Sequence, residues 1–461
     1  MGVPAGGEST PRPKRRDGAS IESGVSRVTP PFSYRYACVR CATPQAWGAI
    51  RYRCEVCGQN LRVERKTDTN SMSAADIVDA FRASQTHGMW RYAALLPVEA
   101  SWGSRLRVGG TPMVDCGEDD GGRGGSSHAG GGVRLWVKDD SRNPSGSLKD
   151  RATELVLAVA RRAGCAQAVT ASTGNAGASL ACIAASQGME ATVVVPFNTP
   201  RIKLAQIRAY GARLLEVDGT YDDAVEVAER LAADARVCCR NTGFNPFTRE
   251  GKKTCAFEIA EAFDWHVPDW VVVPTGDGNI LSGIAAGFLD LYALGITSAV
   301  PRLLAAQASS SNSISQDWRE NDETCALPEA PTAVTPDTVA DSLSVSRPRD
   351  HFAALQALRV TRGACIALED ARIVEASRSL AQRFGLWFEP STAAGYAALH
   401  ACLATGRIKV GARVVLLGTG SGMKSPQGFD SVSAQPVTGG VARVPERPPA
   451  ERHANDPRER T

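Results

Sequence analysis

Residues 138–151 have the sequence Lys-Asp-Asp-Ser-Arg-Asn-Pro-Ser-Gly-Ser-Leu-Lys-Asp-Arg, and this stretch decides the predicted fold. The apolar run 133–137 before it predicts a strand, and its Asn-Pro-Ser-Gly segment predicts a turn. Small and apolar residues then recur at helical spacing over 152–163, with Ser147 as the expected N-cap. Lys149 is therefore expected in the first turn of a helix that follows a strand.

This position gives the amine of Lys149 a possible chemical role. The N-terminus of a helix carries the positive pole of the helix dipole, which disfavours a cation there. Burial would lower the pKa of Lys149 further, and a lysine with a lowered pKa can form a Schiff base. The alternative is a solvated surface lysine beside Asp150 and Arg151, which this stretch alone does not exclude.

Short apolar segments alternate with helical patterns from residue 133 to about 425. Because such strands alternate with helices, the predicted fold class is α/β, with parallel sheets covered on both faces. In sheets of this kind, ligands bind at the carboxyl ends of the strands. The strands are expected at 133–137, 166–170, 191–195, 213–217, 270–273 and 413–417.

Length and composition limit the possible function classes. The chain has 461 residues, of which 43% are hydrophobic and 22% charged, as in a soluble globular protein of two or three domains. A net charge of +3 gives no argument for a nucleic-acid partner, and no apolar run approaches the length of a membrane span. The 13 cysteines and the lack of a secretory signal favour a reducing compartment, expected to be the cytoplasm.

Composition also divides the chain into segments. Residues 1–34 and 426–461 are polar and are expected to be disordered tails. The glycine-rich run 117–132 is expected to be a flexible insertion in a strand connection. Residues 66–425 form the expected main domain, with a small subdomain at about 165–250.

Four cysteines within residues 35–65 predict a metal site. Cys38 and Cys41 form one C-x-x-C pair, and Cys54 and Cys57 form a second after twelve residues. Two such pairs can place four thiolates around one zinc ion, and Gly58 suits the tight turn after the second. A zinc-ribbon-like segment with structural zinc is predicted, and four free thiols are the alternative.

Three glycine-rich loops follow three of the predicted strands, at 172–177, 275–280 and 418–424. The first two open helices, whose N-terminal N–H groups attract an anion, and the close glycines of the second let amides wrap a phosphate. None of the loops contains a Walker motif or fits the dinucleotide fingerprint. Asn175 in the first loop offers a side-chain amide to a phenolic oxygen, and the hydroxyls of the third loop can meet a ring nitrogen. Together with a reactive amine and a phosphate cradle, these groups are what pyridoxal phosphate requires.

On these residues the chain resembles the threonine synthases, within the fold type II (tryptophan-synthase-β-like) family of pyridoxal-phosphate enzymes. The resemblance implies two parallel-sheet α/β subdomains with the cofactor between them. It also implies a carbon–oxygen lyase acting on phosphates, which converts O-phospho-L-homoserine and water to L-threonine and phosphate. The matching stretches are 143–151, 172–177, 201–218, 241–253, 274–283 and 419–424.

The resemblance assigns cofactor contacts to matching positions. Lys149 would hold pyridoxal phosphate covalently and move protons on the substrate. Asn175 would meet the phenolic oxygen of the cofactor, and the hydroxyl of Thr419 its pyridine nitrogen. The cofactor phosphate would lie on the loop made of Gly276, Asp277, Gly278, Asn279 and Ile280.

Substrate contacts follow in the same way. Ser172 and Thr173 would bind the substrate carboxylate. Thr242 and Arg249 are the candidates for its phosphate, because that group needs cationic and hydroxyl partners. A surface ion pair with Glu250 is the alternative for Arg249.

Two departures from the family leave other functions open. Ala176 stands where many threonine synthases have threonine, and Ser425 where the family often has aspartate. One alternative is another fold type II enzyme, an ammonia-lyase or a β-replacement synthase acting on a phosphorylated amino acid. A second is a paralogue that binds the cofactor without turnover. Similar enzymes are often homodimers, and some lie in plastids, which is the alternative to the cytoplasm.

Overall fold

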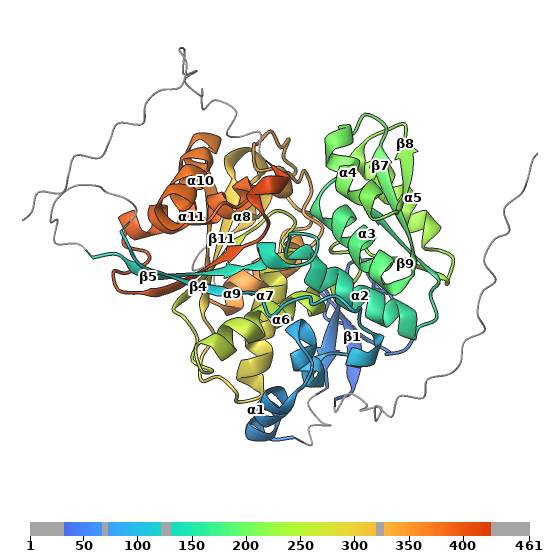
Figure 1. Cartoon of the computed structure of the whole chain (residues 1–461), viewed down its shortest axis with the longest axis horizontal. Helices are drawn as coiled ribbons and strands as arrows, with labels where there is room; N and C mark the ends of the chain where they lie inside the picture. The colour runs from blue at the N-terminus through green and yellow to red at the C-terminus, as the bar shows by residue number, and fades with distance from the viewer. Residues whose placement is uncertain (1–31, 67–71, 121–130, 320–326, 426–461) are drawn as a thin grey trace, which may run out of the picture.

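A computed structural model describes residues 32–66, 72–120, 131–319 and 327–425 (Figure 1). The predicted tail 426–461, residues 1–31 of the predicted tail 1–34 and residues 121–130 of the predicted insertion lie outside this part of the chain. The tail prediction is wrong at its end, because Phe32 is buried and Tyr34 begins a strand. Strand β4 continues to Asp119, so the first residues of the run 117–132 belong to a strand. Its partner β5 begins at Val133, and Asp119 pairs directly with Val133 in the antiparallel ladder.

The larger lobe is built on a six-stranded sheet with the order β12-β11-β10-β13-β5-β4. All neighbours are parallel except β4 and β5 at one edge. Val271 and Val273 pack into one apolar core and Val272 into another, because helices cover both faces. The strands are β4 (Met113–Asp119), β5 (Val133–Asp139), β10 (Trp270–Pro274), β11 (Arg302–Ala308), β12 (Ala364–Leu368) and β13 (Arg413–Gly418).

Six helices belong to this lobe, drawn from yellow to red in Figure 1. Helix α6 packs along α7 on one side of the sheet, and α10 packs along α11 on the other. The helices are α6 (Phe247–Ala262), α7 (Asn279–Ala293), α8 (Ser313–Asp317), α9 (His351–Val360), α10 (Asp370–Phe384) and α11 (Pro390–Ala404).

The smaller lobe, green in Figure 1, is a four-stranded parallel sheet with the order β8-β7-β6-β9. Helix α2 (Lys149–Arg162) lies between the lobes and packs on both α3 and α6. The two parallel sheets confirm the predicted α/β class. The elements of this lobe are β6 (Gln167–Ala171), α3 (Asn175–Gln187), β7 (Glu190–Pro196), α4 (Arg201–Ala209), β8 (Arg213–Val217), α5 (Tyr221–Leu231) and β9 (Val237–Cys239).

The N-terminal segment adds a small antiparallel sheet with the order β2-β1-β3, followed by helix α1 (Ala74–Ala83). Tyr36 stacks on Trp47, and both rings meet Phe247 of α6 edge-on, so this sheet shares the core of the larger lobe. No helix in the described ranges is long and apolar enough to cross a membrane. The strands are β1 (Tyr34–Cys38), β2 (Pro44–Gln45) and β3 (Leu61–Arg65).

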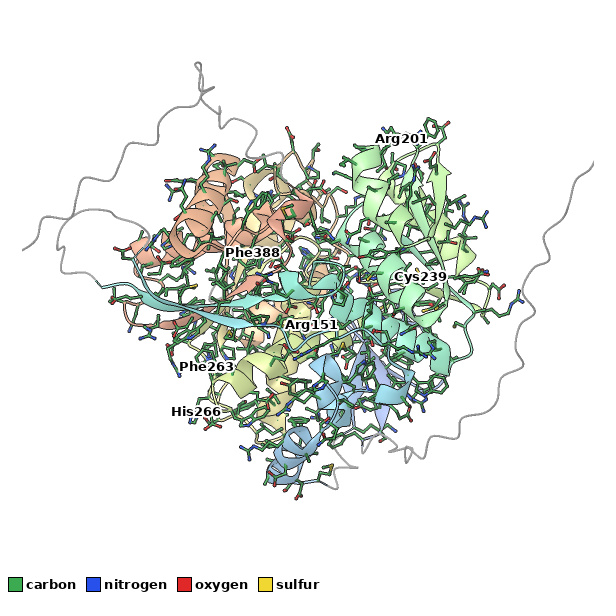
Figure 2. All side chains as sticks on the ribbon, viewed as in Figure 1. Arg151, Arg201, Cys239, Phe263, His266 and Phe388 are labelled. Carbon is green, nitrogen blue, oxygen red and sulfur yellow. The ribbon has the colours of Figure 1, made fainter. Side chains whose placement is uncertain are left out.

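A buried network of charges lies beneath the start of α2. Arg151 is fully buried in the middle of the molecule (Figure 2) and pairs with Asp140 at 2.6 Å and with Glu258 of α6 at 2.7 Å. Lys138 at the end of β5 pairs with Glu258 at 2.6 Å. Burial alone would raise the pKa of Glu258, but Arg151 and Lys138 outweigh it and hold this pKa well below its usual range. The network ties β5, α2 and α6 together directly behind Lys149.

Candidate active site

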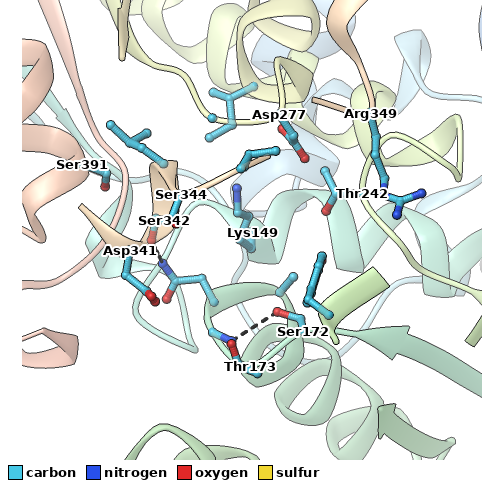
Figure 3. Close-up of a pocket in the computed structure, with 18 of the residues that line it drawn as sticks. Lys149, Ser172, Thr173, Thr242, Asp277, Asp341, Ser342, Ser344, Arg349 and Ser391 are labelled. Carbon is cyan, nitrogen blue, oxygen red and sulfur yellow. Dashed lines mark hydrogen bonds between the residues drawn. The ribbon is translucent and has the colours of Figure 1, made fainter. Parts of the chain in front are cut away.

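A cavity of about 460 Å³ lies at the carboxyl ends of the strands of both sheets (Figure 3). The loop after β6 and helix α5 line it from the smaller lobe. The loop after β10, the segment 341–347, Glu389 and Thr419 line it from the larger lobe. Lys149, at the start of the helix between the lobes, projects into this space.

Lys149 is the first residue of α2, as the sequence predicts. The turn before it is fixed by Asp150, whose carboxylate accepts hydrogen bonds from the amide of Ser145 at 2.6 Å and its hydroxyl at 2.5 Å. The expectation that Ser147 caps the helix is wrong. The N-cap position is Leu148, and Ser147 instead pairs through its backbone with Gly420.

The electrostatic surroundings of Lys149 favour its neutral amine. Its Nζ has no hydrogen-bond or ion-pair partner within the described residues. Burial lowers the pKa of Lys149, and the guanidinium of Arg240 lowers it further, while the carboxylates of Asp277 and Glu389 oppose this. Arg240 is fully buried and donates to the hydroxyl of Thr153 at 3.0 Å and to the backbone carbonyl of Lys149 at 3.4 Å.

Another lysine, Lys252 of α6, lies nearby but is fully buried, and its amine points elsewhere. Burial and the neighbouring Lys149 also lower the pKa of Lys252, well below its usual value. However, Lys252 does not line the cavity, and its Nζ donates a hydrogen bond to the side chain of Asn279. Of these two lysines, only Lys149 presents its amine to the cavity.

The loop after β10 forms an anion cradle on the wall of the cavity. Gly276, Asp277, Gly278 and Ile280 all line it, whereas Asn279 is buried behind them. Among the described residues, the backbone N–H groups of residues 276–278 have no acceptor. Gly278 has a φ of 87°, and a Cβ there would stand 2.7 Å from the Cβ of Ala354. The cradle therefore needs glycine for both its backbone conformation and its close packing.

Glu389 links Asn175 to Thr419 in the wall of the cavity, because both side chains donate a hydrogen bond to its carboxylate. The side-chain amide of Asn175, the first residue of α3, donates to one oxygen of Glu389 at 2.8 Å. The hydroxyl of Thr419, which follows β13, donates to the other oxygen at 3.0 Å. Glu389 is thus part of this site, and its Glu-Pro-Ser sequence, which resembles a cofactor-proximal turn of the superfamily, had given it no assigned role.

Three of the four predicted substrate-binding residues line the cavity, namely Ser172, Thr173 and Thr242. The fourth, Arg249, does not line it. Its guanidinium is buried in an ion pair with Asp350, and it also donates to Ser282 at 3.1 Å. The alternative, a surface ion pair of Arg249 with Glu250, is not formed either, since Arg249 is buried and Glu250 pairs with Lys253 at 2.8 Å.

Arg349 provides a cationic group that sequence analysis missed. It lines the cavity near Thr242 and Ser172, and pairs with Asp222 of α5 at 3.2 Å (Figure 3). Its position depends on the packing of a segment between η6 (Asp341–Leu343) and α9, for which no local pattern gives a signal.

Comparison with known proteins agrees with this geometry. Residues 105–420 match the family described as "Pyridoxal-phosphate dependent enzyme". The chain belongs to this family. It is 32% identical over 402 residues to a protein of Methanocaldococcus jannaschii named "Threonine synthase", covering 87% of this chain and 95% of that one. A protein of the same name from Synechocystis sp. is 33% identical over 310 residues, 67% of this chain and 77% of the other.

A solved structure places the fold within this family. The structure of maize serine racemase superposes with a TM-score of 0.51 and 22% identity, covering 63% of this chain and 84% of that one. The fold is therefore fold type II, and the cofactor of the family is pyridoxal phosphate. The residues present fit this cofactor, because the half-buried amine of Lys149, without a partner among the described residues, faces a cradle of unpaired backbone amides across one cavity.

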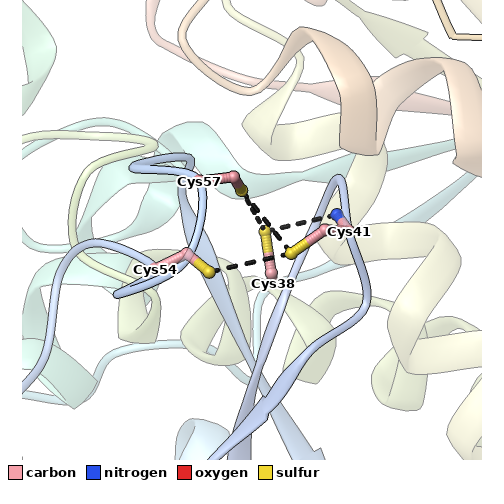
Figure 4. Close-up of side chains that lie close together, drawn as sticks. All are labelled: Cys38, Cys41, Cys54 and Cys57. Atoms are coloured by element: carbon pink, nitrogen blue, oxygen red, sulfur yellow. Dashed lines mark hydrogen bonds between the residues drawn. The ribbon is translucent and has the colours of Figure 1, made fainter.

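The structure also brings together the four cysteines of the predicted metal site (Figure 4). All four sulfur atoms lie within 4.8 Å of one another. The Cys38 and Cys57 sulfurs are 3.4 Å apart, and those of Cys41 and Cys54 are 3.7 Å apart. The described part of the chain contains no disulfide.

Proposed function

We propose that the protein is a threonine synthase, which converts O-phospho-L-homoserine and water to L-threonine and phosphate with pyridoxal phosphate as cofactor. The observation that carries this proposal is the cavity itself, in which the amine of Lys149 stands between groups that suit two separate anions. Relatives named "Threonine synthase" that align over nearly their whole length support the same substrate class. A homodimer and a cytoplasmic location stay predictions from the sequence.

The proposed substrate is an anion at both ends, and the cavity offers a partner for each. The backbone N–H of Thr173 is without an acceptor in the described ranges, and with Ser172 it would hold the substrate carboxylate at the N-terminus of α3. Arg349 and Thr242 would bind the substrate phosphate, because a guanidinium and a hydroxyl form strong hydrogen bonds to phosphate oxygens. Arg349 takes the role that the sequence assigned to Arg249.

The cofactor would be held by residues from four parts of the fold. Residues 276–280 would bind its phosphate, Asn175 its phenolic oxygen, Thr419 its ring nitrogen, and Lys149 its aldehyde carbon. When bound, pyridoxal phosphate supplies an electron-withdrawing ring that acidifies the Cα–H bond of an attached amino acid. Glu389, which already contacts Asn175 and Thr419, would position both side chains.

Lys149 would act as the proton carrier of the reaction. With its pKa lowered by burial, its amine is available to remove the proton at Cα and then one at Cβ. Arg349 would stabilise the negative charge on the phosphate as its bond to Cγ breaks. Water would then add at Cβ, and Lys149 would return the two protons, one to Cγ, from which the phosphate leaves, and one to Cα.

The test is the stoichiometry of products from O-phospho-L-homoserine. We expect the purified protein to release phosphate and L-threonine in equal amounts. Release of ammonia and a 2-oxo acid from serine or threonine, with no phosphate from the phosphorylated substrate, would instead assign the protein to a fold type II ammonia-lyase.

A further inference from the structure

We propose that Cys38, Cys41, Cys54 and Cys57 bind one zinc ion, and that this metal braces the segment carrying Arg349 at the cavity. The sulfur positions match such a site. With Zn–S bonds of about 2.3 Å, the sulfurs of a tetrahedral site lie about 3.8 Å apart. Three of the six sulfur–sulfur separations, 3.4, 3.5 and 3.7 Å, lie close to this value, and all six lie within 4.8 Å. A disulfide would instead bring two sulfurs to about 2.05 Å.

The two cysteine pairs have the same backbone structure. The residue after each pair, Ala42 or Gly58, has a positive φ of 58° or 69°. In each pair the first sulfur accepts a hydrogen bond from the backbone N–H two residues later, at 3.3 Å for Cys38 and 3.4 Å for Cys54. Such N–H groups stabilise the negative charge of thiolates, so both turns are shaped to present metal ligands.

Each turn is also attached to the catalytic part of the molecule. The first turn contacts α9, where Gln356 donates to the carbonyl of Val39 at 2.8 Å and Arg40 lies over the ring of Phe352. The segment leading to the second turn contacts the smaller lobe, where Tyr52 stacks on Phe244 with ring centroids 4.5 Å apart. A metal that joins the two turns therefore joins contacts to both lobes.

Asn60 links this segment to the cavity. Its buried side-chain amide donates to the backbone carbonyl of Arg349 at 2.6 Å, and its side-chain oxygen accepts from Arg53 at 2.9 Å. Asn60 lies three residues after Cys57 in the chain. The position of Asn60 depends on the second turn, so loss of the metal would weaken the hydrogen bond from Asn60 that holds the backbone of Arg349. Asn60 is thus a positioning residue, and its effect on substrate binding rests on the proposed function of Arg349.

The metal is tested on freshly purified full-length protein by elemental analysis. We expect about one zinc per chain, which is lost in Cys41→Ser and retained in Cys165→Ser, whose cysteine lies outside the cluster. If Cys41→Ser does not fold, removal of zinc from the wild type by a chelator, followed by titration of the newly reactive thiols, gives the same answer. Absence of zinc, or the presence of iron in its place, would overturn the proposal that the four cysteines bind zinc.

The bracing is tested by trypsin, because the Arg349–Asp350 bond is a cleavage site within the braced segment. We expect zinc removal and Asn60→Ala each to speed cleavage there severalfold, while Gln59→Ala does not and Asn60→Ala keeps its zinc. With O-phospho-L-homoserine, both changes should raise KM more than they lower kcat. Unchanged cleavage after zinc removal would overturn the bracing. Failure to release phosphate would count against the proposed function alone, since zinc content and cleavage do not depend on it.

Discussion

Replacement of Glu258 by glutamine tests how much the buried charge network contributes to stability. The change keeps the size of the side chain but removes the charge that pairs with both Lys138 and Arg151. Arg151 keeps Asp140 as a partner, whereas Lys138, with 2% of its side chain exposed, keeps only the backbone carbonyl of Thr111 among the described residues. A buried ammonium without a carboxylate costs about 3–5 kcal/mol.

The assay is urea unfolding of Glu258→Gln, with Glu375→Gln as the matched control. Glu375 pairs with Arg372 on the surface, where both side chains are mostly exposed, so its loss should cost less than about 1 kcal/mol. The double variant with Lys138→Met should recover part of the loss, because no unpaired ammonium is left. A cost for Glu258→Gln as small as that of the control would refute the reasoning.

Three further outcomes are expected. The pKa of Glu258 in the folded state lies below its unfolded value of about 4.3, so its ionised form stabilises the fold above that pH, and this stabilisation is lost as pH falls. The free energy of unfolding should therefore decline less for Glu258→Gln than for the wild type between about pH 5 and 3. Gly278→Ala should weaken cofactor binding, measured by titration of the apoprotein with pyridoxal phosphate, more than Gly295→Ala, since both have positive φ but only Gly278 has neighbours that a Cβ would strike. Arg349→Ala should raise KM for O-phospho-L-homoserine about 10- to 100-fold through loss of a charged hydrogen bond, whereas an unchanged KM would remove Arg349 from the phosphate site.

The fold and much of the cavity could be predicted because local patterns specify them. Apolar strands alternating with helices gave both parallel sheets, and the turn before Lys149 placed it at a helix N-terminus. The loops at 172–177 and 275–280 face each other because carboxyl ends of parallel strands gather ligand-binding loops.

The remaining features depend on contacts between distant segments. Arg249 was assigned to the substrate because the sequence gave no sign of its real partner, Asp350, which lies 101 residues away. Arg349 was not recognised as a cation of the site, and no role could be assigned to Glu389, because tertiary packing brings these side chains to the cavity.

The lysine that holds the cofactor can be identified directly. Treatment of the holoenzyme with borohydride fixes pyridoxal phosphate to that lysine, and peptide mass spectrometry then locates it. We expect the label on Lys149, whose amine faces the cavity. A label on Lys252, the neighbouring buried lysine with a lowered pKa, or no labelled lysine at all, would contradict this expectation.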